Sequence, residues 1–146
     1  MTQLGSYQRA FDLAVEKHAD QYDLRGGPYI NHVLAVAAET LASTQAERDS
    51  DVVVAALLHD IIEDTDVTLA QIRKAFGRDV AEIVDHLTRR SSETYFDYIG
   101  RAASHPLARV VKLADNKVNS WDVPTESLAK RYAKARRILL AADRVA

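Results

Sequence analysis

The segment with the clearest chemical potential spans residues 55–65, where an apolar run leads into closely spaced ionisable side chains. The sequence Ala-Ala-Leu-Leu precedes His59 and Asp60, and Glu63 and Asp64 follow after two isoleucines. Burying ionised groups costs free energy unless they are paired or bind a metal. The segment therefore indicates a metal site with acid and base groups beside it.

The spacing of these four residues predicts that they share one helix face. His59 and Glu63 are four positions apart, as are Asp60 and Asp64, and residues four apart are neighbours on a helix. If the His-Asp pair binds a metal, both later carboxylates lie within reach of a metal-bound water, where they can take or give a proton. The alternative is a solvated helix end, but carboxylates are unfavourable at a helix C-terminus.

Two further polar residues adjoin apolar runs and extend this set. His32 opens the apolar segment 33–38, and Asp115 closes the largely apolar segment 109–114. Each residue alone also fits a helix cap or a satisfied core position, and a His-Asp dipeptide alone is weak evidence because short motifs occur by chance. Together the four supply two imidazoles and two carboxylates, which suit a hard or borderline metal ion.

Several residues outside this set are candidates for binding an anion. Arg89 and Lys112 follow apolar stretches, and Asn119 lies one helical turn after the last candidate ligand. Solvated surface charge is an equally good interpretation of each basic residue taken alone. A basic run at 130–137 surrounds Tyr132 and is either a solvated face or the border of an anionic substrate.

Composition limits the classes of protein to which this chain can belong. Its 146 residues fit one domain, and 47% hydrophobic and 27% charged residues are ordinary for a soluble globular protein. A net charge of −2 does not indicate a nucleic-acid partner. The absence of cysteine excludes thiolate ligands and disulfides. Without a signal pattern or membrane-spanning run, we expect a cytoplasmic protein with no membrane partner; its oligomeric state is left open.

The elements that must position these residues are helical almost throughout. Glycine and proline are scarce and clustered, so the loops are expected to be short. The expected helices cover about residues 6–19, 32–42, 51–62, 68–77, 79–87, 94–104, 106–114 and 128–144. The prediction is a single all-α domain, residues 1–146, that forms a compact bundle of about seven or eight helices.

Taken in order, the motifs resemble the HD-domain metal-dependent phosphohydrolases, and within them the alarmone (ppGpp) hydrolases of the small, Mesh1-like type. The match runs over about residues 7–121. It is carried by K-H-x-x-Q at 17–21, G-x-P-Y-I-x-H at 26–32, A-A-L-L-H-D-x-x-E-D-T at 55–65, L-T at 87–88 and V-K-L-A-D-x-x-x-N at 111–119.

The resemblance implies an all-helical HD fold that hydrolyses the 3′-pyrophosphate of ppGpp or pppGpp to GDP or GTP and pyrophosphate. It implies a single metal, usually Mn²⁺ although another divalent ion is possible, bound by the equivalents of His32, His59, Asp60 and Asp115. The catalytic set matched by the family motifs is Glu63, Asp64 and Asn119. The implied substrate-binding residues are Arg25, Arg89, Lys112 and Tyr132.

Some positions depart from the family pattern, mostly where the nucleotide base is held. Asp23 and Leu24 stand where the family often has a basic pair that packs against guanine, and Arg25 is slightly displaced from it. Ala135 stands where Mesh1-like enzymes carry an aromatic residue, and Asn116 where a basic residue often follows the last metal ligand. The resemblance therefore implies intact chemistry with altered base recognition.

Three alternatives follow from these departures. The substrate is an adenine alarmone such as ppApp, or the chain is another HD-type nucleotide phosphohydrolase, such as a nucleotidase or an NADPH phosphatase. In the third alternative, the chain is a nucleotide-binding module that keeps the fold without turnover. The retained ligand set argues against this last alternative.

Overall fold

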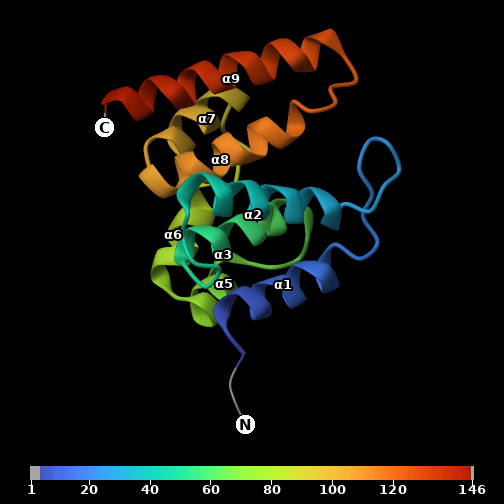
Figure 1. The fold of residues 1–146 in the computed structure, drawn as a ribbon, viewed down its shortest axis with the longest axis vertical. Coiled ribbons are helices and arrows are strands. Elements are labelled where there is room, and N and C mark those ends of the chain that lie inside the picture. Colours follow the sequence, from blue (N-terminus) through green and yellow to red (C-terminus); the bar gives the residue numbers. More distant parts are fainter. Residues whose placement is uncertain (1–3, 146) are drawn as a thin grey trace.

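The computed structural model describes residues 4–145, and within them it contains helices and no β-strand (Figure 1). The expected all-α fold is confirmed, and the fourth helix is only a four-residue turn. No helix within the described residues is long and apolar enough to cross a membrane. The helices are α1 (Ser6–Lys17), α2 (Ile30–Thr44), α3 (Asp51–Leu57), α4 (Ile61–Asp64), α5 (Leu69–Phe76), α6 (Arg78–His86), α7 (Tyr95–Ala103), α8 (Pro106–Asn119) and α9 (Glu126–Val145).

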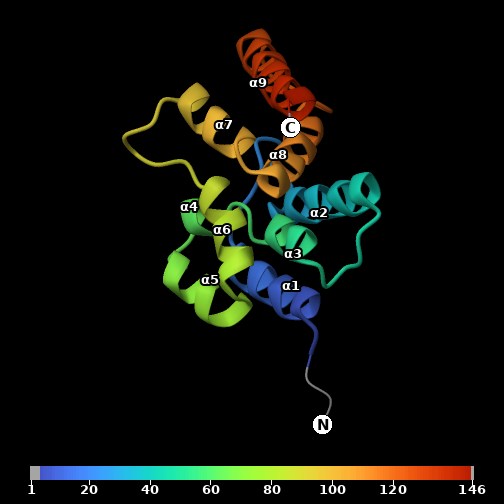
Figure 2. The same ribbon diagram turned by 90° about the vertical axis from the view of Figure 1, so that its left-hand side faces the viewer.

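Helix α3 is the centre of the main core. All of its residues from Val52 to Leu57 are buried, as expected of a helix that is apolar on every side. It contacts α1, α2, α6 and α8, which enclose it (Figures 1 and 2). The residues directly after its C-terminal end, Leu58 and His59, therefore lie in the interior of the molecule.

Helix α8 joins this core to a second, smaller one. It contacts α2 on one side and both α7 and α9 on the other (Figure 2). The second core contains Ile99, Leu139 and Ala135, all fully buried. Ala135 is therefore a packing residue of the α7–α9 contact, which explains why a small side chain occupies this position.

Local sequence signals mark the ends of several helices. Thr68 and Gln71 form a capping box at the start of α5, and Gly77 follows the end of α5 with a φ of 95°. Pro106 occupies the first turn of α8, where its missing N–H has no helical partner to lose. These caps set where the short helices of the bundle begin and end.

The single helix expected over residues 51–62 is wrong, because α3 ends at Leu57 and α4 begins at Ile61. In an uninterrupted helix, the Ala56 carbonyl would accept the N–H of Asp60. Here the Nδ1–H of His59 donates to that carbonyl at 2.7 Å. The side chain thus replaces a backbone hydrogen bond, and the chain turns at the His-Asp pair.

Candidate active site

Three of the predicted metal ligands form a compact cluster. One nitrogen of His32, one nitrogen of His59 and one carboxylate oxygen of Asp115 all lie within 4.8 Å of one another. Nε2 of His32 is 2.9 Å from Oδ1 of Asp115, and Nε2 of His59 is 3.5 Å from the same oxygen. The cluster joins α2, the end of α3 and α8, whose packing brings together residues 83 positions apart.

The fourth predicted ligand, Asp60, lies at the edge of this cluster. Its Oδ2 is 2.9 Å from Nε2 of His59 and 3.9 Å from Nε2 of His32. The hydroxyl of Tyr29 donates a hydrogen bond to the same oxygen. Burial raises the pKa of Tyr29, and the charge of Asp60 raises it further, so the hydroxyl keeps its proton and remains a donor.

The donor atoms of this cluster fit a divalent metal ion. Nδ1 of His59 donates to a backbone carbonyl, so Nε2 carries the lone pair. That Nε2 is buried without a hydrogen-bond partner, although carboxylate oxygens of Asp60 and Asp115 lie nearby. In the neutral ring, a lone pair that faces carboxylates favours a cation between them, and histidine ligands of metals commonly donate their other N–H to a carbonyl. Two ligand atoms of one ion can lie up to about 4 Å apart. The distances given above between the imidazole nitrogens and the carboxylate oxygens fall within this range.

Asp115 is held as an ionised carboxylate by a buried lysine. Nζ of Lys112 lies 2.6 Å from Oδ2 of Asp115, and both side chains are largely shielded from solvent. Burial by itself raises the pKa of Asp115, but the opposing effects, of which the charge of Lys112 is the largest, hold that pKa well below its usual range. The amide of Asn119 donates to Oδ1 at 3.2 Å. The carboxylate is therefore preorganised for binding a cation.

Glu63 and Asp64 project from α4 toward the same region and retain protons more readily than ordinary carboxyls. Burial raises the pKa of Glu63, while the backbone N–H of Arg89, which donates to its carboxylate, partly opposes the shift. Burial likewise raises the pKa of Asp64, and the neighbouring charge of Asp60 adds to it. A carboxyl whose pKa is raised is suited to exchanging protons with a substrate near neutral pH.

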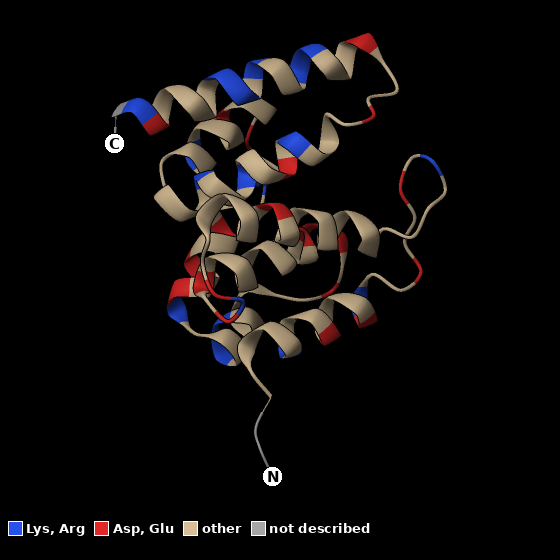
Figure 3. Cartoon of the chain, in the orientation of Figure 1, with Lys and Arg blue, Asp and Glu red and all other residues tan. Residues whose placement is uncertain are grey.

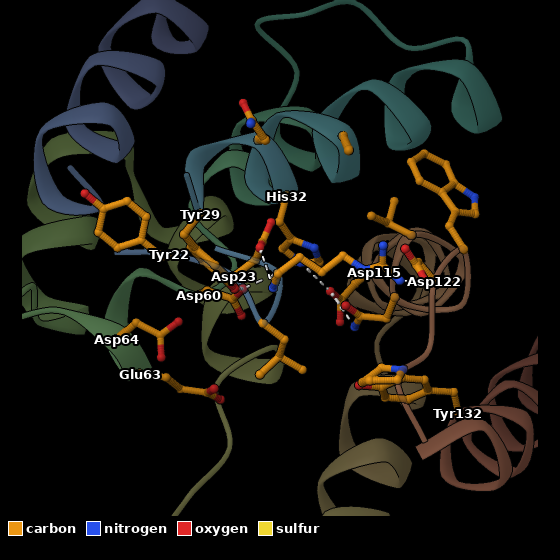
Figure 4. A pocket seen from close by; sticks show the side chains of 18 of the residues that line it. Tyr22, Asp23, Tyr29, His32, Asp60, Glu63, Asp64, Asp115, Asp122 and Tyr132 are labelled. Carbon is orange, nitrogen blue, oxygen red and sulfur yellow. Dashed lines mark hydrogen bonds and ion pairs between the residues drawn. The ribbon is translucent and has the colours of Figure 1, made fainter. Parts of the chain in front are cut away.

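The cluster opens into a cavity of about 680 Å³, within the size range of ligand pockets. Figure 4 shows Glu63 and Asp64 on one side of it and Tyr132 on the other, with the ligand cluster between them. The predicted site residues that line the cavity are Arg25, His32, Asp60, Glu63, Asp64, Lys112, Asp115, Asn119 and Tyr132.

Two predicted residues do not line the cavity. His59 lies beneath it and is 2% exposed, as expected of a ligand at the floor of a site. Arg89 turns its guanidinium toward the carbonyl of Glu93 at 3.3 Å. The structure therefore does not place Arg89 as a phosphate-facing side chain. Arg89 contributes to the site through its backbone N–H, which donates to the Glu63 carboxylate.

The loop between α1 and α2 is shaped by Asp23. Its Oδ1 accepts the backbone N–H groups of Arg25 and Gly27, each at 2.9 Å. Such bonds from an aspartate to its own loop stabilise a turn. Arg25 at the loop tip pairs with Asp122, which lies in the connection between α8 and α9. The departure at Asp23 thus has a structural role in positioning Arg25 at the cavity.

The residues that line the cavity but were missed by the sequence interpretation include Tyr29, Tyr95 and Arg131. Tyr29 lies in the G-x-P-Y-I-x-H motif, so its spacing before His32 was a usable signal. Tyr95 and Arg131 come from α7 and α9, and the guanidinium carbon of Arg131 lies 4.7 Å from the ring centre of Tyr95. No sequence pattern joins these two residues, since only the packing of α7 against α9 brings them together.

His18, the histidine of the K-H-x-x-Q motif, lies in the interior of the protein. It is 1% exposed, and Nδ1 lies 2.7 Å from Oε1 of Gln21. Its ring centre is 5.2 Å from that of Tyr29. The K-H-x-x-Q motif therefore packs behind the residue that donates to Asp60.

Comparison with known proteins identifies the family of this chain. The family model described as "HD domain" matches residues 10–146. The guanosine-3′,5′-bis(diphosphate) 3′-pyrophosphohydrolase of Aquifex aeolicus is 36% identical over 137 residues, covering 87% of this chain but 19% of that protein. The mouse enzyme of that name, MESH1, is 40% identical over 121 residues, covering 78% of this chain and 67% of the relative.

A solved structure gives the same result. It belongs to a metazoan ortholog of SpoT that hydrolyzes ppGpp and plays a role in starvation responses. The TM-score is 0.78 at 29% identity, with 97% of this chain and 87% of the other covered. This chain spans only about a fifth of the bacterial relative's length, but that alignment covers 87% of this chain. By its ligand cluster, its fold and its sequence, the chain belongs to the HD domain family.

Proposed function

We propose that this protein hydrolyses the 3′-pyrophosphate of a guanosine alarmone, releasing GDP or GTP and pyrophosphate. The observation that carries the proposal is the arrangement around the cavity. A His/Asp cluster that fits a metal faces the same cavity as two carboxyls with raised pKa values. Relatives that align over most of this chain carry the name of this activity.

The metal in this proposal is Mn²⁺, held by His32, His59, Asp60 and Asp115. Imidazole and carboxylate donors suit a divalent ion of intermediate hardness, and no thiolate is available to favour a softer one. When bound, such an ion supplies Lewis-acid polarisation of a phosphate and of a water molecule. The protein's own contribution is a fixed, desolvated set of donors.

Proton transfer in the proposal belongs to Glu63 and Asp64. Hydrolysis breaks the bond between the 3′-oxygen and phosphorus, so the attacking water must lose a proton and the leaving 3′-oxygen must gain one. The ionised form of one carboxyl accepts the first proton, and the protonated form of the other supplies the second. The N–H of Arg89 fixes the Glu63 carboxylate while leaving it open to the cavity.

Substrate positioning is proposed for four residues that line the cavity. The Lys112 ammonium lies closest to the ligand cluster, where it favours an anionic phosphate. Asn119 hydrogen-bonds to Asp115 and offers the rest of its amide to the substrate. Arg25 and Tyr132 border the outer part of the cavity, where the nucleoside is expected.

The experiment is a hydrolysis panel with the purified, Mn²⁺-loaded protein. We expect ppGpp to yield GDP and pyrophosphate in equal amounts, measured by separate assays for pyrophosphate and orthophosphate. Turnover of ppApp in place of ppGpp would assign the adenine alternative. Release of orthophosphate would assign a nucleotidase or an NADPH phosphatase, and no turnover of any substrate would contradict the proposal.

Two broader expectations accompany this function. We infer that residues 1–146 act as one hydrolase domain, which the family match over residues 10–146 supports. The cytoplasmic location stays a prediction from the sequence. Fractionation of cells that produce the protein checks it.

A further inference from the structure

The cations that line the cavity differ in whether a carboxylate already neutralises them. Arg25 pairs with Asp122, and Lys112 pairs with Asp115. Arg131 lines the same cavity, and within residues 4–145 no carboxylate lies at ion-pairing distance from it. A guanidinium that borders a cavity without a counter-charge is available for an anion from solution.

The position of Arg131 is defined by an aromatic ring. Its guanidinium carbon lies 4.7 Å from the ring centre of Tyr95, a half-buried residue of α7 that also lines the cavity. Stacking on a ring orients a guanidinium while leaving the N–H groups at its edge free for a ligand. The pair therefore forms a preorganised donor at the α7–α9 wall.

Part of this wall lies across the cavity from Glu63 and Asp64. Tyr132, the neighbour of Arg131 on α9, lies across the cavity from Glu63 and Asp64 (Figure 4). Asp60 and Asp115 belong to the ligand cluster that lies between these two sides (Figure 4). An alarmone carries phosphates at both its 3′ and 5′ positions, and the carboxylates of the cluster, Glu63 and Asp64 repel any phosphate that the metal does not neutralise.

We propose that Arg131, held on the ring of Tyr95, binds the 5′-phosphate groups of the nucleotide whose 3′-diphosphate lies at the His/Asp cluster. This inference rests on the proposed function and names the part of the substrate that the function leaves unassigned. A planar guanidinium binds phosphate through two parallel hydrogen bonds, which gives both affinity and orientation.

The proposal for Arg131 does not depend on the many basic residues of α9 as a group. Figure 3 shows several lysines and arginines along that helix. Lys130 pairs with Glu126 at 3.3 Å, and Lys134 lies 4.1 Å above the ring of Phe96 without lining the cavity. Lys134 is therefore a matched control, since it is also a cation on an aromatic ring of α7.

The test compares Arg131→Gln and Lys134→Gln on two substrates, ppGpp and guanosine 3′-diphosphate without 5′-phosphates. We expect Arg131→Gln to raise KM for ppGpp about tenfold or more, because a charge-assisted hydrogen bond is lost. KM for the substrate without 5′-phosphates should be unchanged. Lys134→Gln should behave as the wild type on both, and Arg131→Lys should recover part of the loss.

A second measurement separates this inference from the proposed function. Titration calorimetry with GDP and with guanosine, in the presence of Mn²⁺, measures the contribution of the 5′-phosphates to binding without any turnover. We expect Arg131→Gln to weaken GDP about tenfold and to leave guanosine unchanged. Equal losses for both ligands, or no loss for GDP, would overturn the role of Arg131 even if ppGpp is hydrolysed. A GDP-specific loss without hydrolysis would retain it while rejecting the proposed activity.

Discussion

Lys112 and Asp115 form an ion pair one turn apart on α8, and the two oxygens of this carboxylate face different partners. Oδ2 lies 2.6 Å from the lysine ammonium, whereas Oδ1 lies 2.9 Å from Nε2 of His32. The lysine therefore keeps a buried carboxylate ionised while leaving one oxygen for the cluster. Stability and cation binding both depend on this division.

Replacing Lys112 with Met tests the pair through stability. Breaking a buried pair leaves an uncompensated charge, so we expect the free energy of unfolding in the absence of metal to fall by about 3 kcal/mol. Lys117→Met on the same helix removes a more exposed pair with Glu39 and should cost less than about 1 kcal/mol. Urea denaturation measures both, and equal small losses would show that the buried pair does not stabilise the fold.

Metal binding should depend on His59 and not on a surface histidine. His59 offers a free Nε2 at the cluster. We therefore expect His59→Gln to weaken Mn²⁺ binding by more than about 100-fold, because removing even a hydrogen bond that supports a metal ligand costs up to about 100-fold in affinity. His86→Gln should leave it unchanged. Equilibrium dialysis with elemental analysis measures the affinity, and comparable Mn²⁺ binding by both variants would refute the assignment.

Glu63→Gln should reduce kcat by roughly 100- to 10,000-fold, the usual contribution of a proton-transfer group, with the bound metal retained. Asp66→Asn is the control, because Asp66 lies just beyond α4 but pairs with Lys17 and does not line the cavity. Steady-state kinetics on ppGpp with a parallel metal analysis distinguishes lost chemistry from lost metal. A Glu63→Gln variant with normal kcat would remove this residue from the mechanism.

His105 should make stability fall in mild acid. Its Nδ1 accepts the N–H groups of Leu107 and Ala108 at the start of α8, at 3.1 and 3.3 Å. Burial lowers the pKa of His105, and the adjacent His86 lowers it further. Because the folded pKa lies below the unfolded one, this contribution is complete above about pH 6.5 and is lost as the pH falls through the folded pKa.

A variant that cannot titrate isolates this effect. His105→Asn keeps a side chain suited to an N-cap, so between about pH 7.5 and pH 5 it should lose less stability than the wild type. Urea denaturation at both pH values gives the difference. Identical pH dependence in the two proteins would show that the cap does not titrate in this range.

The sequence was sufficient for the fold class and for most of the residues that meet at the site. Apolar periodicity and the few clustered glycines and prolines predicted the helices, because these signals act within a few residues of chain. His32, His59 and Asp115 were recognisable because each adjoins an apolar run that had to be buried. The continuity of the helix through His59 was mispredicted, because a side chain that bonds to Ala56 competes with the backbone there.

The sequence by itself therefore determined the local elements and the donor set, since helix propensity, capping and the burial of apolar runs are short-range properties. Only the tertiary structure decided which surface each polar residue faces. Arg89 bonds to the carbonyl of Glu93 and does not line the cavity. Arg131 and Tyr95 meet at its wall, where α7 packs against α9 through buried residues such as Ala135 and Leu139. Such contacts join distant positions through shape and close packing, which no local pattern encodes.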